Sequence, residues 1–132
     1  PHYRRYVLQQ SGNPLAGPNG HPGATRDVGH RAPLGVRDGK GIMFVGYNGE
    51  IYPAGFLPVR CGKFPEDSVV EVYRNHSAFC ALRDPDQFKG KCGYCEYRQI
   101  CGGSRSRAYA VTGDMLESEP DCAYQPQEAA MA

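Results

Sequence analysis

The sequence predicts a small α+β fold, a loop-rich domain with one β-hairpin, two or three short helices and a four-cysteine loop. The 132 residues include 17 Gly and 11 Pro, too many helix breakers for an all-helical bundle. An Asn-Gly pair lies between β-prone segments, as in a tight hairpin. Three of the six cysteines fall within ten residues, where they can organise a loop around a shared centre.

Charge and hydropathy exclude several kinds of partner. The formal net charge is +1, so strong electrostatic binding to duplex nucleic acid is not implied. No apolar run approaches the roughly 20 residues that a membrane span needs. No leader has the features of a signal peptide. We therefore expect a cytoplasmic protein with no nucleic-acid partner and no membrane span.

Residues 1–40 are expected to form an N-terminal segment followed by a Gly/Pro-rich loop. Residues 1–10 are amphipathic but too short for an independent helix, so we expect a strand or an element packed on another domain. Residues 11–40 contain seven Gly and four Pro without periodicity, as in a long loop or linker. His21 and His30 lie in this loop and are expected to be exposed rather than metal ligands.

A β-hairpin is the clearest local structure. The segment Ile42–Tyr47 is β-prone, and Glu50–Tyr52 returns after the turn. Asn48-Gly49 predicts a two-residue turn, because both central positions of that turn need positive φ. Pro53 cannot donate to a sheet ladder and is expected to end the second strand.

Two short helices are expected next. Ser68 and Glu71 have the spacing of a capping box and predict a helix that begins after Ser68. Ser77 is expected to cap a second helix. The Asp84-Pro85 pair stops that helix and provides a start for one more turn.

A third helix is expected over Ser104–Thr112, with Gly113 as its C-cap. Residues 114–132 contain no Lys or Arg, and the carboxylates Glu117 and Glu119 are expected to be solvated. The last residues, 127–132, are expected to be a flexible tail.

Four cysteines have the spacing of metal or cluster ligands. Their pattern is Cys92-x2-Cys95-x5-Cys101-x20-Cys122. A clustered triplet with a distant fourth thiolate is typical of the sets that hold iron–sulfur cubes. Glycines suit such a loop, because backbone amides must approach the sulfides closely and the turns need unusual φ. A disulfide within the tight C-x-x-C pair would be strained.

Zinc is the rival metal at these cysteines. A four-cysteine zinc site usually pairs two C-x2–4-C knuckles, and this chain has one, so spacing alone leaves zinc open. Cys61 and Cys80 lie outside the pattern. We expect Cys80 to be a buried small hydrophobe on a helix face and Cys61 to be a bystander.

Basic residues surround the cysteine loop. A four-thiolate cube carries net negative charge, which cationic neighbours stabilise. Arg105 and Arg107, one turn after Cys101, are the best candidates for this environment. The six basic residues between positions 83 and 107 are Arg83, Lys89, Lys91, Arg98, Arg105 and Arg107.

Two stretches of the sequence carry a resemblance to a known family. They are GEIYPAGFLPVRCGKF and ALRDPDQFKGKCGYCEYRQICGGSRSRAYAVTGDMLESEPDCAYQP. Residues 41–126 resemble the C-terminal auxiliary-cluster (SPASM) domain of radical SAM enzymes. Within that family they most resemble the haem-biosynthesis branch, which includes the iron-coproporphyrin decarboxylase (haem synthase) and the enzymes that modify propionates of the denitrification haem.

The resemblance implies which residues hold the cluster. The family's auxiliary 4Fe–4S ligands fall on Cys92, Cys95, Cys101 and Cys122. Members with two auxiliary clusters carry further cysteines where this chain has Ala54 and Ser104. The resemblance therefore implies one 4Fe–4S cluster in this chain.

The motif that binds the S-adenosylmethionine cluster is missing. None of the six cysteines has the C-x3-C-x2-C spacing. S-adenosylmethionine would then belong only to a separate radical SAM catalytic barrel, on the same polypeptide or on another subunit, and this chain is not expected to be catalytic alone. Because the chain opens with Pro1 rather than Met, an excised C-terminal domain is the favoured expectation.

The resemblance implies electron transfer and substrate positioning for a porphyrin or peptide substrate. Tyr52, Arg60 and Lys63 are candidate substrate contacts, since propionates pair with Arg or Lys. Two alternatives remain at this point. One is a zinc-stabilised structural or interaction module without a redox role, and the other is a non-catalytic protein that binds a modified peptide or a porphyrin.

Overall fold

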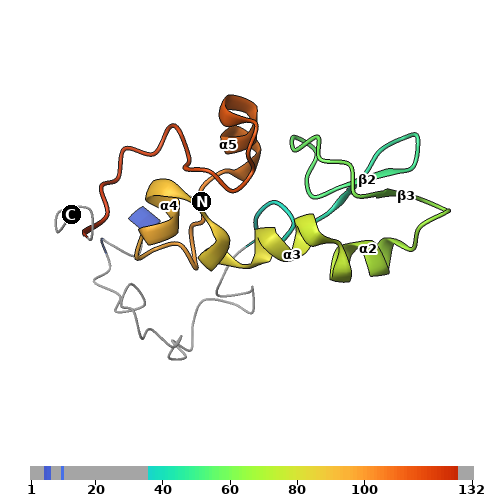
Figure 1. Cartoon of the computed structure of the whole chain (residues 1–132), viewed down its shortest axis with the longest axis horizontal. Coiled ribbons are helices and arrows are strands. Elements are labelled where there is room, and N and C mark those ends of the chain that lie inside the picture. Colours follow the sequence, from blue (N-terminus) through green and yellow to red (C-terminus); the bar gives the residue numbers. More distant parts are fainter. Residues whose placement is uncertain (1–4, 7–9, 11–35, 128–132) are drawn as a thin grey trace.

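The structure, a computed structural model, describes residues 5–6, 10 and 36–127. Most of the expected N-terminal loop, with His21 and His30, and the end of the expected tail lie outside these residues. Within them the small α+β fold is confirmed (Figure 1). The elements are β1 (Phe44–Val45), β2 (Glu50–Tyr52), β3 (Gly62–Lys63), α2 (Val69–Asn75), α3 (Ser77–Arg83), the 3-10 turn η2 (Pro85–Gln87), α4 (Gly90–Tyr94) and α5 (Arg105–Thr112).

The sheet and the cysteine-rich segment lie toward opposite ends of the molecule. Figure 1 shows β2, β3 and α2 at one end, α4 with the red C-terminal segment at the other, and α3 between them. In the described part of the chain the sheet is antiparallel with the order β1-β2-β3. No described helix is long and apolar enough to cross a membrane.

The hairpin forms as expected, but its turn differs from the prediction. Phe44 pairs with Tyr52, and the Gly49 N–H donates to the Gly46 carbonyl at 2.9 Å, so the connection spans 46–49 rather than two residues. Gly49 has φ 86°, whereas no described residue other than glycine has positive φ. The predicted two-residue turn is therefore wrong. Asn48 keeps ordinary backbone geometry and accepts from the Glu50 N–H at 3.2 Å instead.

A third strand, β3, was not expected from the sequence. Gly62 and Lys63 pair with Ile51 and Glu50 of β2. A strand of two residues is too short to show an alternating hydrophobic pattern in the sequence, so only its pairing with β2 defines it. Gly49 accommodates the approach, because a Cβ there would lie 2.3 Å from the Phe64 carbonyl oxygen.

The predicted cap at Ser68 is confirmed, and Ser104, predicted as the first residue of a helix, is instead the cap of α5. Ser68 caps α2 by accepting from the Glu71 N–H at 3.4 Å, and Ser104 caps α5 by accepting from the Arg107 N–H at 3.2 Å. The expected cap of α3 is wrong. Ser77 is its first helical residue, and His76 Nδ1 accepts from the Ala78 N–H at 3.1 Å. The first backbone N–H groups of a helix have no partner within the helix, and an imidazole nitrogen can accept from one of them as a hydroxyl oxygen can.

The ends of the helices also follow the sequence. Asp84 caps η2 through the Asp86 N–H at 3.1 Å. Gly113 ends α5 in the left-handed conformation with φ 77°, and its N–H donates to the Tyr109 carbonyl. The short α4, which contains Cys92, was not predicted, because its glycines disguise the helical pattern.

The described core is divided into small clusters. Three groups of buried side chains follow one another along the molecule: Ile51, Cys61, Ala78 and Phe79; then Ala54, Leu57 and Leu82; then Tyr97, Ile100 and Cys101. The last group includes a cysteine of the predicted ligand set. The region around it therefore has little apolar core of its own.

The described end of the predicted loop is docked on the domain. The buried Arg37 donates to the carbonyl oxygens of Arg98 at 3.4 Å and Leu82 at 3.5 Å. Asp38 accepts from the backbone and hydroxyl of Ser106 at 2.8 and 2.6 Å. These contacts fix residues 36–40 against the start of α5.

Candidate metal centre

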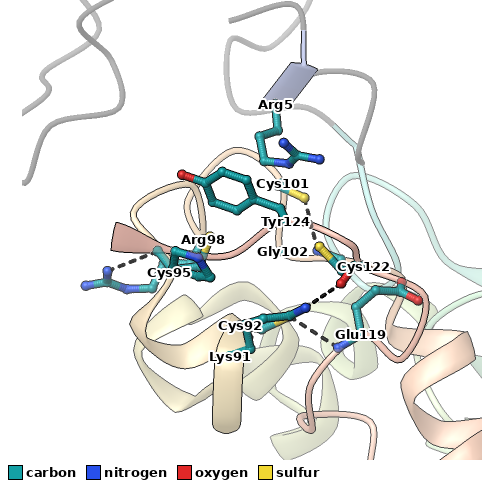
Figure 2. A pocket seen from close by; sticks show the side chains of 12 residues that line it. Arg5, Lys91, Cys92, Cys95, Arg98, Cys101, Gly102, Glu119, Cys122 and Tyr124 are labelled. Atoms are coloured by element: carbon teal, nitrogen blue, oxygen red, sulfur yellow. Dashed lines mark hydrogen bonds between the residues drawn. The ribbon is translucent and has the colours of Figure 1, made fainter. Parts of the chain in front are cut away.

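All four predicted ligand cysteines line one pocket. Cys92, Cys95, Cys101 and Cys122 surround it together with Gly102, Gly103 and Glu119 (Figure 2). The pocket is partly open, and the space in it that no protein atom occupies, open solvent included, is about 350 Å³. Charged residues at its wall are Arg5, Lys91, Arg98 and Glu119.

Three separate segments bring these cysteines together. The buried Cys92 lies on α4, and Cys95 is the C-cap residue of that helix. Cys101 follows a set of turns, in which its N–H donates to the Tyr97 carbonyl at 2.9 Å. Cys122 returns to the pocket after α5, and Lys91 Nζ donates to its carbonyl oxygen. The long spacer before Cys122 is therefore the helix that carries the chain away and back.

The sulfur of Cys92 accepts two hydrogen bonds. Arg105 Nη2 lies 3.3 Å from it, and the Glu119 backbone N–H lies 3.3 Å from it on another segment. Figure 2 shows the Glu119 contact as a dashed line. Donors aimed at sulfur stabilise a thiolate, which is the form that binds metals and clusters.

Arg105 is fully buried, with 0 % of its surface exposed. Its Nη1 donates to the carbonyl oxygens of Met115 at 3.2 Å and Glu117 at 2.8 Å, and its guanidinium lies 4.5 Å from the centre of the Phe88 ring. Of these groups and the Cys92 sulfur, only the sulfur can carry a full negative charge. A buried cation is stable where it has such a partner, so this end of the pocket suits an anionic sulfur.

Neither basic residue predicted for the cluster environment lines the pocket itself; Arg105 contacts the Cys92 sulfur, whereas Arg107 contacts carboxylates. The Arg107 guanidinium pairs with Glu119 at 3.0 Å and with Asp121 at 2.9 Å. It therefore reaches the site only through these carboxylates, which flank the segment before Cys122.

The Gly102-Gly103 pair fits a crowded cradle. Both residues have φ 65°, and the Gly103 N–H donates to the Cys101 sulfur at 3.5 Å. A Cβ on Gly103 would lie 2.8 Å from Arg105 Nη2 and 3.4 Å from the Cys92 sulfur. Glycine is therefore required at position 103 for two reasons: the backbone has positive φ, and a side chain would collide with Arg105 and approach the Cys92 sulfur.

Glu119 was expected to be solvated, and that expectation is wrong. Its side chain is fully buried, with one oxygen accepting from the Ser104 N–H at 2.6 Å and the other from the Asp121 N–H at 3.2 Å. It thereby joins the loop after Cys101 to the loop before Cys122. A lone Glu in an acidic tail carries no sequence signal for this position, because its partners are backbone groups brought together by the fold.

The pocket wall includes an aromatic and a cationic group in contact. The Arg5 guanidinium lies 4.4 Å from the centre of the Tyr124 ring (Figure 2). Tyr97 meets Tyr124 edge to face, with 5.4 Å between ring centres. Tyr124 donates its hydroxyl to Glu96. Burial, followed by that hydrogen bond, raises the pKa of Tyr124 well above its usual value.

Burial also affects the cysteines themselves. It raises the pKa of Cys95 to about 11, and it raises the pKa of Cys101, with the Gly103 N–H acting in the opposite direction. These thiols are protonated at neutral pH without a ligand. Binding a metal group would therefore release their protons.

Four thiols around one pocket are a donor set for two kinds of metal group. Among the described residues, no group of three or more His, Cys, Asp or Glu side chains is arranged as the ligands of a single metal ion. One zinc ion binds four thiolates in a tetrahedron, with Zn–S bonds of about 2.3 Å. A 4Fe–4S cube is bound by four cysteines through its separate irons. The donor set, four thiols with sulfur-directed N–H groups, fits a 4Fe–4S cube and is also compatible with zinc.

The predicted substrate contacts lie elsewhere. Tyr52, Arg60 and Lys63 are not in the pocket wall but gather around Glu50 at the sheet. Tyr52 donates its hydroxyl to Glu50, Arg60 Nε pairs with it at 3.4 Å, and Lys63 is its cross-strand partner. The hydrogen bond from Tyr52, then that from Asn48, lowers the pKa of Glu50. Glu50 itself was not predicted.

The two remaining cysteines have different environments. Cys61 is buried in the first core cluster, where its thiol donates to the Val59 carbonyl at 3.3 Å and burial raises its pKa to about 11. Cys80 was expected to be buried, but it is exposed, which corrects that prediction. Phe79 and Leu82 occupy the inward side of α3 instead.

No family model matches the chain, but several curated proteins are similar to it in sequence. It is 43 % identical over 127 residues to an AdoMet-dependent heme synthase of Methanosarcina barkeri, covering 96 % of this chain and 35 % of that protein. It is 34 % identical over 132 residues to an AdoMet-dependent heme synthase of Oleidesulfovibrio alaskensis, covering 97 % and 32 %. A PqqA peptide cyclase of Bradyrhizobium diazoefficiens is 38 % identical over 60 residues, covering 45 % and 16 %. The chain thus spans about a third of the length of the curated heme synthases it matches.

Proposed function

Because this chain is a homologue of radical SAM/SPASM-type enzymes and matches about a third of the heme synthases' length, we propose that it is the auxiliary-cluster part of such an enzyme. In this proposal residues 41–126 form the domain. Cys92, Cys95, Cys101 and Cys122 hold one 4Fe–4S cluster. S-adenosylmethionine binds to a catalytic barrel outside this chain.

One observation carries the proposal. Four thiols from three segments line a single pocket, and nitrogen donors are directed at two of the sulfurs. An ordinary surface loop has no reason to bury a guanidinium against a thiol. A site that binds thiolates to an anionic group does.

The proposed role is electron transfer and substrate positioning. A 4Fe–4S cluster supplies one-electron chemistry when bound. With all four positions taken by cysteine, no site is left for substrate, so the residues serve to hold the cluster and set its charge environment. Arg105 places a fixed cation beside Cys92, and Glu119 keeps the segment before Cys122 in register with the Cys101 loop.

The proposed substrates are a porphyrin or a related cofactor or peptide precursor. Arg60 and Lys63 would pair with substrate carboxylates, and Tyr52 would contact its apolar part. In this structure Glu50 gathers all three. Substrate carboxylates would therefore have to compete with Glu50 for Arg60.

The first experiment measures iron, acid-labile sulfide and zinc in anaerobically purified protein, together with its visible spectrum. The proposal expects about four irons and four sulfides per chain, with broad visible absorption. Cys92→Ala and Cys122→Ala should each remove most of the cluster. Cys80→Ser, which alters an exposed cysteine outside the pocket, should leave the content unchanged.

The same measurement separates the alternatives. One zinc per chain without sulfide would overturn the redox role and identify a structural zinc module. Porphyrin binding by metal-free protein, unchanged in Cys92→Ala, would identify a binding protein instead.

A further inference from the structure

The β-hairpin carries an apolar surface that the cysteine pocket does not explain. We call it the hairpin face and define it as Ile42, Phe44, Val45, Tyr47 and Phe56. All five side chains are exposed, Tyr47 fully and Phe56 to 90 %. Isolated exposed apolar residues are ordinary, but five on one hairpin and its adjoining loop are a concentration of the kind that marks an interaction site.

Phe44 and Val45 follow one another in β1 and point to opposite sides of the sheet, so the hairpin face includes apolar side chains on both sides of the hairpin. Phe44 lies beside Gly55, the neighbour of Phe56, because a Cβ on Gly55 would lie 3.6 Å from its ring. The Phe44 and Tyr52 rings lie 6.4 Å apart across the two strands. On the side of Phe44, the apolar surface therefore extends from β1 to the loop after β2.

The edge of the sheet is also unprotected. β1 is at the end of the order β1-β2-β3, so one side of its backbone has no strand partner among the described residues. Exposed edges are usually blunted by Lys, Pro or inward charges. Residues 41–49 contain no charged residue and no Pro. A strand of this kind is suited to be covered by another part of a protein.

The comparisons indicate how large the covering partner is. The heme synthases that this chain matches are about three times as long as the matched part, so most of such an enzyme lies outside it. The rim of the hairpin face suits a protein interface, since Glu50, Arg60 and Lys63 place both charge signs beside the apolar centre. A small ligand would cover only part of the β1 edge, whereas a protein partner could cover all of it.

We propose that the hairpin face is the surface by which this domain docks against the catalytic part of its radical SAM enzyme. The apolar side chains form the centre of the interface, and the free edge of β1 lies within it. This inference rests on the proposed function only in taking the catalytic part as the partner. It makes no use of the cluster.

Hydrogen exchange of the complete enzyme tests the docking surface. The amides of residues 42–49 should exchange at least about tenfold more slowly in the complete enzyme than in this chain alone. The amides of α5, which are internal to the domain, serve as the reference and should be equally protected in both. Equal exchange of residues 42–49 in the two samples would overturn the proposal.

Variants of the complete enzyme provide a second test that does not require the isolated chain to fold. The double variant Tyr47→Ser, Phe56→Ser should restore fast exchange at residues 42–49 while α5 stays protected. Val70→Ser, which removes a half-exposed apolar side chain on α2, is the matched control and should change nothing there. Protection that persists in the double variant and in its control alike would contradict the assignment.

Other occupants of the hairpin face give distinct results. Protection in the isolated chain that grows with protein concentration would identify a second copy and overturn the proposal. Protection that appears only on adding coproporphyrin would identify a substrate surface, also against it. Iron and sulfide content is measured in the same samples. A missing cluster with a protected hairpin would refute the proposed function alone, and the reverse result would refute the docking surface alone.

Discussion

Arg105 is the residue whose environment depends most directly on the chemistry of the pocket. It is fully buried, and its guanidinium contacts two carbonyl oxygens, the Phe88 ring and the Cys92 sulfur. Burying a cation is costly unless an anion or several acceptors compensate. The guanidinium therefore both supports the fold and places positive charge beside one proposed ligand.

Replacing Arg105 by Gln is expected to lower the midpoint potential of the bound cluster. The cation stabilises the more negative reduced state, so its loss should shift the potential by on the order of 60 mV, a tenfold change for one electron. Redox titration followed by electron paramagnetic resonance measures this. Arg107→Gln is the control, since the Arg107 guanidinium pairs with the carboxylates of Glu119 and Asp121 rather than with a cysteine sulfur. An equal shift in both variants would contradict the role of Arg105.

Gly103→Ala is expected to destabilise the domain and reduce cluster content. The new Cβ would meet Arg105 and Glu119 at 2.8 Å in a backbone conformation that disfavours side chains. Gly113→Ala is the matched control, because Gly113 also has positive φ but nothing lies within 4 Å. In denaturant unfolding, Gly113→Ala should lower the free energy of unfolding by about 1 kcal/mol. Gly103→Ala should lower it by a further ~1–3 kcal/mol. Equal losses would show that the cradle is not crowded.

Glu119→Ala tests the carboxylate that joins the two ligand loops. Its removal leaves the Ser104 and Asp121 N–H groups without this acceptor, which should cost about 2 kcal/mol of unfolding free energy. Thermal or denaturant unfolding measures the loss. Glu66→Ala, at an exposed position, should change stability by less than about 0.5 kcal/mol. A Glu119 variant as stable as this control would refute the joining role.

At the scale of elements, short helices are placed by caps and by distant side chains. α5 is capped by Ser104, and Asp38 from the N-terminal side adds a second acceptor at Ser106. α3 takes its cap from His76, directly after α2. Helices of seven or eight residues are marginal by themselves, so such contacts decide where they begin.

Asp38→Ala is expected to loosen residues 36–40 from α5. The variant loses an acceptor that serves both the backbone and the hydroxyl of Ser106, with a cost of about 1 kcal/mol. Hydrogen exchange at residues 36–40 and at the start of α5 should rise. Asp38→Asn keeps one oxygen and should lose less. Unchanged exchange in Asp38→Ala would show that Arg37 alone holds the segment.

At the scale of the whole molecule, two ends carry different surfaces. Figure 1 shows β2 and β3 at one end and α4, which carries Cys92, at the other. The uncharged hairpin face belongs to the first end, and the cysteine pocket, with Arg5, Lys91 and Arg98 at its wall, belongs to the second. The core between them is divided, and its last cluster already contains Cys101. The pocket end therefore depends on whatever binds the cysteines more than the sheet end does.

Removing the cluster with a chelator is expected to unfold the pocket end first. Amide exchange should rise strongly over residues 90–104 and 117–124. It should rise much less in α2, α3 and β2, which pack on the first two core clusters. Exchange that rises uniformly over the whole chain would contradict this division. Exchange that does not rise at all would show that the pocket end folds without the group.

Local features were predictable from the sequence because they depend on neighbours along the chain. The hairpin, the Ser68 cap, the Gly113 terminus and the three cysteines at positions 92, 95 and 101 all follow from spacing within a few residues. The turn was predicted to contain only Asn48 and Gly49, but the connection spans residues 46–49. With a glycine at each end, the longer connection is equally compatible with the sequence. The family resemblance likewise followed from ordered motifs.

The tertiary structure alone decided which distant groups meet. It buried Glu119 and Arg37, exposed Cys80, added β3, and gathered Tyr52, Arg60 and Lys63 around Glu50 away from the pocket. A charged side chain gives no sequence signal of burial, because its partners are backbone groups and sulfur atoms from other segments. The sequence determined the candidate ligand cysteines and most of the short elements; the packing of those elements determined the environment in which these cysteines lie.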